Sequence, residues 1–191
     1  MRIIAGSAKG RVLLSPIGAT ARPTSDRARE ALFSSLESEF GDVDGISFLD
    51  LFAGSGAVAA EALSRGAIRV VAVEGDRENA DVARKNLELV SESAKTEESE
   101  VHAMTVERFL AGVHALKPFD VIFLDPPYEH SNSSVSEILD SIVKKKLLHE
   151  RSLVVIERES KSGFIWPEAM REVKVRRYGH ASMHYGELIS R

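Results

Sequence analysis

Two carboxylates stand where an apolar run of the chain ends in a glycine turn or in a rigid proline loop. Asp50 lies in the run Leu49-Asp50-Leu51-Phe52-Ala53-Gly54-Ser55-Gly56. Asp125 follows the apolar run 119–124 and begins the tetrapeptide Asp125-Pro126-Pro127-Tyr128. Two successive prolines remove two backbone donors and fix φ twice, so the chain must leave the sheet there as a stiff loop. Open α/β sheets place their chemistry at such carboxyl ends of central strands.

The glycine turn indicates a binding site for a cofactor that contains adenosine. Gly54 and Gly56 allow a ligand to approach the backbone closely. Glu74 ends the next apolar run, eighteen residues after Gly56, where its carboxylate can accept hydrogen bonds from a ribose diol. The spacing Gly54-x-Gly56-x-x-Ala59 also satisfies the dinucleotide fingerprint, so the turn leaves both a nicotinamide dinucleotide and S-adenosylmethionine open.

The positions of the two carboxylates favour S-adenosylmethionine. Asp50, just before the turn, can receive an amino-acid ammonium group but would repel a pyrophosphate. The Asp125 carboxylate and the Pro126 carbonyl can accept the protons of a planar amine whose lone pair is delocalised into its ring, and Tyr128 can stack on that ring. The sequence therefore predicts methyl transfer to a ring amine, with Asp125, Pro126, Pro127 and Tyr128 at the catalytic site.

Metal chemistry is not indicated by the residues available. The chain has no cysteine, which excludes disulfides and thiolate metal sites. The six histidines show no ligand spacing: His102, His114, His130, His149, His180 and His184. We therefore expect no metal, and surface or structural roles for the histidines.

The elements that must position these residues alternate between strands and helices. Apolar runs predict strands over 47–52, 69–74, 100–104, 119–124 and 152–157. Helical periodicity predicts helices over 24–40, 57–65, 76–90, 106–116 and 134–148. This alternation predicts an α/β fold with a mostly parallel sheet. Two final strands, 172–178 and 183–189, are joined by a short link and are expected to be antiparallel neighbours.

The first thirty residues are basic, whereas the chain as a whole carries a net charge of −4. Residues 1–29 contain one acid, Asp26, and six basic residues: Arg2, Lys9, Arg11, Arg22, Arg27 and Arg29. Apolar runs at 2–5 and 11–14 flank a glycine-containing segment, which predicts a β-hairpin. The charge asymmetry fits either a basic arm that contacts a polyanion or a solvated charged segment.

Taken together, the motifs resemble those of known methyltransferases. Three motifs resemble those of class I amino-methyltransferases: Asp50-x-Phe52-Ala53-Gly54-x-Gly56, Glu74 and Asp125-Pro126-Pro127-Tyr128. Two N-terminal blocks resemble signatures of the bacterial 16S rRNA guanine-N2 methyltransferases of the small-subunit methyltransferase D type: Arg2-Ile3-Ile4-Ala5-Gly6-x-x-Lys9-Gly10-Arg11 and Arg22-Pro23-Thr24-Ser25-Asp26-Arg27-Ala28-Arg29-Glu30-Ala31-Leu32-Phe33. The similarity spans nearly the whole chain. The Asp-Pro-Pro-Tyr loop by itself is less specific, because DNA adenine-N6 enzymes share it.

This resemblance implies a Rossmann-like class I S-adenosylmethionine-dependent methyltransferase fold. Its sheet would have seven strands, mostly parallel with an antiparallel last strand. Residues 1–23 would form a small N-terminal β-hairpin extension that contacts RNA, and residues 24–191 the catalytic domain. The implied reaction is methylation of N2 of a guanine in 16S rRNA, of the type that modifies position 966, within a partly or fully assembled small subunit. No segment suits a signal peptide or a membrane span, so we expect a cytoplasmic protein, and a monomer.

The resemblance also assigns residues to each ligand. The cofactor residues would be Asp50, Phe52, Ala53, Gly54, Ser55, Gly56, Glu74, Thr105 and Asp125. Thr105 departs from the family, which often has Asp or Asn there, so backbone amides remain to bind adenine while a side-chain contact is less well supported. The residues expected to contact RNA are Lys9, Arg11, Arg22, Thr24, Arg27 and Arg29. Contacts to phosphates would give position more than base specificity, and some of these arginines can instead pair with Asp26 or Glu30.

Three other functions remain open on the sequence. A DNA adenine-N6 methyltransferase shares the proline loop but would need a target-recognition domain, and none is apparent. A nicotinamide-dependent oxidoreductase fits the glycine turn. An RNA-binding module without catalysis fits the basic N-terminus, although the intact Asp125 loop argues against it.

Overall fold

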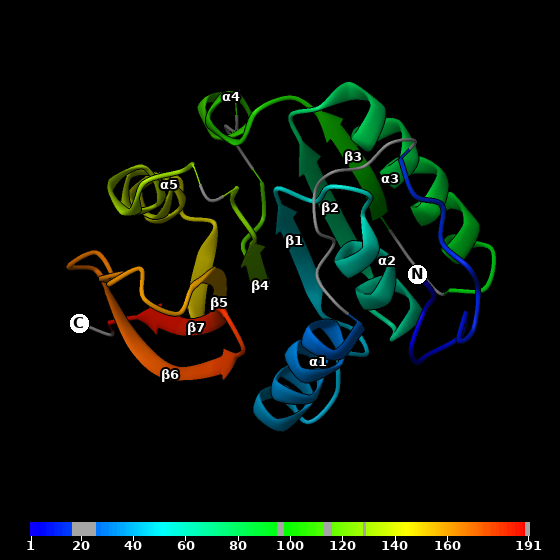
Figure 1. Ribbon diagram of the computed structural model, residues 1–191, viewed down its shortest axis with the longest axis horizontal. Helices are drawn as coiled ribbons and strands as arrows, with labels where there is room; N and C mark the ends of the chain where they lie inside the picture. The colour runs from blue at the N-terminus through cyan, green and yellow to red at the C-terminus, as the bar shows by residue number, and fades with distance from the viewer. Residues whose placement is uncertain (17–25, 95–97, 113–115, 128, 190–191) are drawn as a thin grey trace.

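The computed structural model describes residues 1–16, 26–94, 98–112, 116–127 and 129–189 of the 191-residue chain. It confirms the predicted alternation of strands and helices (Figure 1). The helices are α1 Asp26–Phe40, α2 Ala57–Ser64, α3 Arg77–Ser91, α4 Val106–Gly112 and α5 Asn132–Lys144. The strands are β1 Ser47–Leu51, β2 Arg69–Glu74, β3 Glu98–Ala103, β4 Phe119–Leu124, β5 Leu148–Glu159, β6 Met170–Tyr178 and β7 Ala181–Leu188.

The strands form one seven-stranded sheet in the order β3-β2-β1-β4-β5-β7-β6. Strands β1 to β5 pair in parallel, and β7 is antiparallel to both of its neighbours, β5 and β6. The predicted fold class is therefore confirmed. The chain runs outward from β1 to β2 and β3, and then returns to place β4 on the other side of β1. This reversal separates the connections that leave β1 and β4, and open α/β sheets bind ligands at such a switch point.

Helices cover both faces of the sheet and enclose two apolar cores (Figure 1). Phe48, Val121 and Phe123 point to the face covered by α1, α2 and α3. Leu49 and Ile122 point to the opposite face, where α4 and α5 pack. Each such side chain contributes about 1.5–3 kcal/mol when it is fully buried, so the two central strands are held from both sides. Within the described ranges, no helix is both long and apolar enough to cross a membrane.

The largest difference from prediction lies at the end of α5. The expected helix 134–148 stops at Lys144, and Lys146 takes a left-handed φ of 56°. Leu147 and Leu148 are buried, and Leu148 already belongs to β5. The apolar spacing continues past the turn, so periodicity alone could not locate the helix end.

The N-terminal arm, residues 1–16, forms the predicted hairpin with a single antiparallel bridge, between Arg2 and Val12. The backbone of Ile3 is hydrogen-bonded on both sides, to Arg11 O at 2.9 Å and from Gly10 N at 2.9 Å. Three side chains of the arm are buried in the core that α1 and α2 share: Ile3, Ala8 and Leu13. The predicted domain boundary at residue 23 lies outside the described residues.

Polar side chains of α2 attach the arm to the body of the molecule. The Glu61 carboxylate accepts hydrogen bonds from Ile4 N at 2.8 Å and Ala5 N at 3.0 Å. Ser64 Oγ donates to Ala5 O at 2.6 Å. Gly6 has φ 82°, and a Cβ there would lie 1.8 Å from Ser64 O, so only glycine fits this close approach. The arm is thereby built into the packing of α2.

Candidate active site

The switch point brings Asp50 and Asp125 to neighbouring strand ends. Leu51 of β1 pairs with Leu124 of β4, and Asp125 N donates to Leu51 O at 3.4 Å. Asp50 therefore lies just before the end of β1, and Asp125 just after the end of β4. The two carboxylates are close enough that the charge of Asp125 influences the protonation of Asp50.

Asp50 is a buried carboxylate with one oxygen available. The residue is 1% exposed. Its Oδ2 accepts a hydrogen bond from Ala59 N in the first turn of α2, at 3.1 Å, and this bond alone would lower its pKa. Burial, and also the charges of Asp125 and Glu74, raise the pKa of Asp50 well above its usual range. Its Oδ1 is buried and has no hydrogen-bond partner in the described part of the chain. A ligand ammonium group would satisfy this oxygen and neutralise the carboxylate.

The glycine turn needs its two glycines for different reasons. Gly56 has φ 74°, and a Cβ there would lie 2.9 Å from the Ala83 Cβ, because α3 packs directly against the turn. Gly54 has φ 55°, and no atom lies within 4 Å of the position its Cβ would take. One glycine therefore permits close packing of helix on turn, whereas the other leaves space that a ligand can occupy.

Phe52 is held in a strained backbone conformation at the start of this turn. Its φ is 66°, which costs a residue with a side chain roughly 1–2 kcal/mol. Its ring packs edge-on against His130, with centroids 5.1 Å apart. Strain of this kind persists where the surroundings impose it, commonly at functional sites. The strained turn is consistent with the predicted cofactor role of residues 52–56.

Glu74 is fixed at the end of β2 by two backbone donors. Its Oε2 accepts from Gly54 N at 2.6 Å and its Oε1 accepts from Asp76 N at 2.8 Å. Each carboxylate oxygen has a further lone pair for a ribose hydroxyl. Thr105 is exposed, and its Cα lies 3.9 Å from the position of a Gly75 Cβ, beside Glu74. The predicted cofactor residues of β1, β2 and the turn before α4 thus lie at the carboxyl ends of neighbouring parallel strands.

The proline loop leaves β4 at the same carboxyl ends of the sheet. Asp125 is half-buried, Pro126 is buried and Pro127 is exposed. The Pro127 carbonyl accepts a hydrogen bond from His130 N at 2.9 Å, which leaves the Pro126 carbonyl as the candidate acceptor for a substrate amine. Tyr128 lies outside the described residues.

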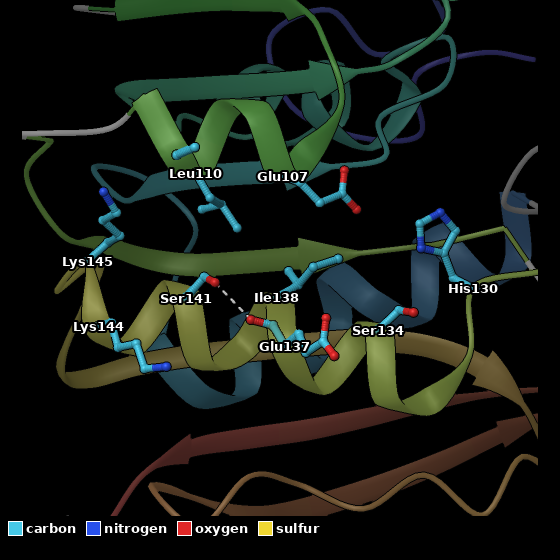
Figure 2. Close-up of a pocket in the computed structure, with 10 residues that line it drawn as sticks. Glu107, Leu110, His130, Ser134, Glu137, Ile138, Ser141, Lys144 and Lys145 are labelled. Carbon is cyan, nitrogen blue, oxygen red and sulfur yellow. Dashed lines mark hydrogen bonds between the residues drawn. The ribbon is translucent and has the colours of Figure 1, made fainter.

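A groove of about 360 Å³ runs between α4 and α5 (Figure 2). His130 lies at one end, and Lys144 and Lys145 lie at the other. Glu107 and Glu137 line the middle. Asp50 and Asp125 do not line this groove, so it is separate from the carboxylate pair.

Arg29 does not lie on a surface that RNA could reach. Its side chain is fully buried. Its Nη2 donates to Arg2 O at 2.7 Å and to Asp26 Oδ1 at 3.0 Å, and its Nε lies 3.5 Å from Glu61 Oε2. The prediction that Arg29 contacts phosphates is therefore wrong, because the face of α1 that carries it packs against the arm and α2.

The other predicted RNA contacts differ in how available they are. Arg11 Nη1 donates to Leu89 O at 2.5 Å and to Glu92 Oε2 at 2.8 Å, so this guanidinium is engaged by α3. Lys9 and Arg27 are exposed and line a hollow of about 450 Å³ between the arm and α1. Arg22 and Thr24 lie outside the described residues.

Asn86 connects the arm to the glycine turn, a role that the sequence analysis missed. The residue is fully buried in α3. Its Oδ1 accepts from Leu14 N at 2.8 Å, and its Nδ2 donates to Leu14 O at 3.1 Å and to Ser55 O at 2.8 Å. A polar residue next to Leu87 on the apolar face of a predicted helix was the available signal.

Arg158, near the end of β5, was also missed. It is 6% exposed and interacts electrostatically with Asp125. An arginine that follows the apolar run 153–156 was the signal. Within the described ranges, no group of three or more His, Asp or Glu side chains could hold a metal ion.

Comparisons with known proteins agree with this arrangement. The ribosomal RNA small subunit methyltransferase D of Haemophilus influenzae is 35% identical over 182 residues, which cover 95% of this chain and 91% of that protein. The solved structure of yhhF from Escherichia coli is 28% identical, with a TM-score of 0.84, and covers 100% of this chain and 99% of its own. Magnesium protoporphyrin IX methyltransferase from Synechocystis PCC 6803, solved with bound SAM, shares the fold at 12% identity, with a TM-score of 0.62 over 85% of this chain and 79% of its own.

The site accordingly fits the cofactor of the class I methyltransferases, S-adenosylmethionine. The buried Asp50 Oδ1, the open space at Gly54 and the fixed Glu74 carboxylate are the observations that support this fit. The model of the family described as conserved hypothetical protein 95 matches residues 1–187. The chain therefore belongs to this family, that of ribosomal RNA small subunit methyltransferase D.

Proposed function

We propose that this protein transfers a methyl group from S-adenosylmethionine to the exocyclic N2 of a guanine in 16S rRNA. It would be an enzyme of the type that modifies the guanine at position 966. The observation that carries the proposal is the pair of carboxylates at the switch point: Asp50 with a free buried oxygen, and Asp125 at the start of a proline loop. The relatives named as rRNA methyltransferases support rRNA as the substrate. A cytoplasmic monomer that acts on an assembling small subunit fits this proposal.

The residues divide into those that hold the cofactor and those that handle the amine. Asp50 Oδ1 binds the ammonium group, and the Glu74 carboxylate accepts the ribose hydroxyls. The turn 52–56, with its open space at Gly54, would line the cofactor site, and backbone amides near Thr105 would bind the adenine. When bound, S-adenosylmethionine supplies an electrophilic methyl group on a sulfonium.

The proline loop prepares the amine for attack. A guanine N2 lone pair is delocalised into the ring, so the nitrogen is a weak nucleophile. The Asp125 carboxylate and the Pro126 carbonyl accept its two N–H groups, which favours a pyramidal nitrogen with a localised lone pair. As the nitrogen–methyl bond forms and the sulfur–methyl bond breaks, Asp125 takes the proton that the nitrogen releases. Tyr128 stacks on the base and holds it in position.

A methyl-transfer assay tests the reaction. The substrate is small subunits from cells that lack this protein, and the modified base is then mapped. Incorporation at N2 of one guanine is expected. Incorporation at an adenine, or only into DNA, would contradict the substrate, and tight dinucleotide binding with none for S-adenosylmethionine would contradict the reaction.

Variants of Asp125 test the division of roles. Asp125→Ala removes the proton acceptor and should lower the rate of transfer by roughly 100-fold or more, while the dissociation constant for S-adenosylmethionine in calorimetry stays nearly unchanged. Asp125→Asn keeps one acceptor oxygen and should give an intermediate rate. If cofactor binding is lost with Asp125→Ala, the residue belongs to the cofactor site instead.

A further inference from the structure

Arg158 is a buried arginine beside the proline loop. Ile156 of β5 pairs with Leu124 of β4, so Arg158 lies two residues further along β5, at the level where the loop that begins at Asp125 leaves the sheet. The residue is 6% exposed. An arginine is rarely buried so far unless it is paired.

The guanidinium of Arg158 is hydrogen-bonded to His130 and Asn132, which follow the proline loop in the chain. Its Nη2 donates to His130 O at 2.7 Å and to Asn132 Oδ1 at 3.2 Å. Asn132 Nδ2 donates in turn to Ser162 O at 2.6 Å, beyond the end of β5. The His130 ring packs on Phe52 of the cofactor turn. His130 and Asn132 are thus tied to β5, and His130 is also tied to the turn proposed to hold the cofactor.

Arg158 also interacts electrostatically with the proposed catalytic carboxylate, Asp125. The charge of Asp125 interacts with that of Asp50 on β1 and with that of Arg158 on β5, and Arg158 also interacts with Glu159 at the end of β5. Asp50 and Asp125 repel each other, and Arg158 opposes that repulsion. Arg158 Nε and Nη1 are buried without a hydrogen-bond partner in the part of the chain that the structure describes. The guanidinium therefore retains two nitrogens whose donors are not used within this part of the chain.

We propose that Arg158 is a positioning residue for methyl transfer: it anchors His130 and Asn132 in the segment after the proline loop and favours the ionised form of the Asp125 carboxylate, which accepts the proton of the amine. This rests on the proposed function, because only a reaction that releases a proton needs this acceptor. Arg158 itself does not touch the reacting atoms.

Three variants separate the charge from the hydrogen bonds. Arg158→Gln removes the charge, Arg158→Lys keeps the charge but not the forked donor, and Asn132→Ala removes one anchor without any change of charge. For each variant, kcat and KM are measured from pH 5 to 9 on the same small subunits, together with the dissociation constant for S-adenosylmethionine. Thermal unfolding shows whether each variant is folded.

Arg158→Gln should lower kcat roughly 100-fold with little change in cofactor binding. The acid side of its pH profile should move to higher pH, because a carboxylate without a neighbouring cation binds a proton more readily. Arg158→Lys and Asn132→Ala should lower kcat less and keep the wild-type acid side. A residue that only packs against the loop would lower kcat without moving the profile, and that result would overturn the proposal, as would a wild-type kcat in Arg158→Gln.

Two further outcomes stay informative. If Arg158→Gln does not fold, Arg158→Lys decides, because an acid side that moves despite the retained charge would contradict the proposal. If the wild-type enzyme methylates a different amine, the proposed substrate fails, but the same variants can be compared on that amine. The two proposals therefore fail separately.

Discussion

At the scale of single residues, the site depends on a carboxylate that the fold does not itself satisfy. Asp50 is buried, and one of its oxygens has no partner among the described residues. Burial, and to a smaller extent two other acids, raises its pKa. A folded-state pKa above the unfolded value, about 3.9, means that Asp50 favours folding only while it is protonated. That contribution is complete below the unfolded value and is lost as the pH rises toward the folded value. A ligand ammonium group bound at Asp50, as proposed, would remove this cost.

Asp50→Asn should therefore stabilise the cofactor-free protein and abolish cofactor binding. At a pH where Asp50 is ionised, the substitution removes a buried charge, so the melting temperature should rise by a few degrees. This gain should shrink as the pH falls below the raised pKa of Asp50. Scanning calorimetry at several pH values measures this. In the wild type, affinity for S-adenosylmethionine should increase with pH, because binding favours ionised Asp50. Affinity that falls with rising pH would contradict this role of Asp50.

At the scale of elements, the N-terminal arm and the cofactor turn share the same supporting helices. Glu61 of α2 holds the arm backbone, and Asn86 of α3 joins Leu14 of the arm to Ser55 of the turn. The predicted RNA-contacting extension is thereby attached to the elements that position the cofactor. Arg29 and Glu61 form the buried ion pair at this junction, and both are fully buried.

Glu61→Gln should destabilise the protein by about 3–5 kcal/mol, because it leaves the buried Arg29 guanidinium without its buried counter-charge. Glu37→Gln is the matched control: Glu37 pairs with Arg65 at 2.5 Å but its side chain is 44% exposed, so the loss should stay below about 1 kcal/mol. Urea unfolding of both variants measures the difference. Glu61 also pairs with Arg65 Nε, at 2.9 Å, so equal losses would mean that the buried Glu61 charge contributes no more than the exposed Glu37 charge.

At the scale of the whole molecule, a chain of net charge −4 that binds rRNA, as proposed, would need a local basic surface. The structure narrows the candidates for that surface. Arg29 is buried and Arg11 is engaged by α3, whereas Lys9 and Arg27 are exposed beside the same hollow. RNA binding by the arm should therefore depend more on Lys9 and Arg27 than on the other two.

Lys9→Glu and Arg27→Glu should each weaken binding to small-subunit RNA and reduce the slope of log affinity against log salt by about one. Cofactor affinity should not change. Lys117→Glu is the control, because Lys117 is exposed just before β4, at the opposite end of that strand from Asp125. Filter binding at several salt concentrations measures the slopes. If Lys117→Glu weakens binding as much, the effect is one of net charge alone.

Much of the fold follows from local patterns that a sequence displays directly. Strands 69–74 and 119–124 were predicted with their observed bounds, because apolar runs bounded by turn residues are local signals. The glycine turn after β1 and the proline loop after β4 were also predicted, since glycines and prolines constrain the backbone wherever they occur. The end of α5 could not be predicted from the sequence. Leu147 and Leu148 keep the helical spacing, but both are buried after the helix has ended, and Leu148 already begins β5.

What the sequence by itself determined is therefore the α/β alternation, the glycine turn with Asp50 and the proline loop with Asp125. Only the tertiary structure decided which charged residues are buried inside the molecule. Arg29 meets Glu61 across 32 positions, and Arg158 meets His130 across 28, through pairings of helix and strand that no local spacing encodes. The physical reason is that burial of a charge depends on what the rest of the chain packs around it. An arginine on an exposed surface can contact RNA, whereas an arginine that the rest of the chain buries serves as a structural anchor.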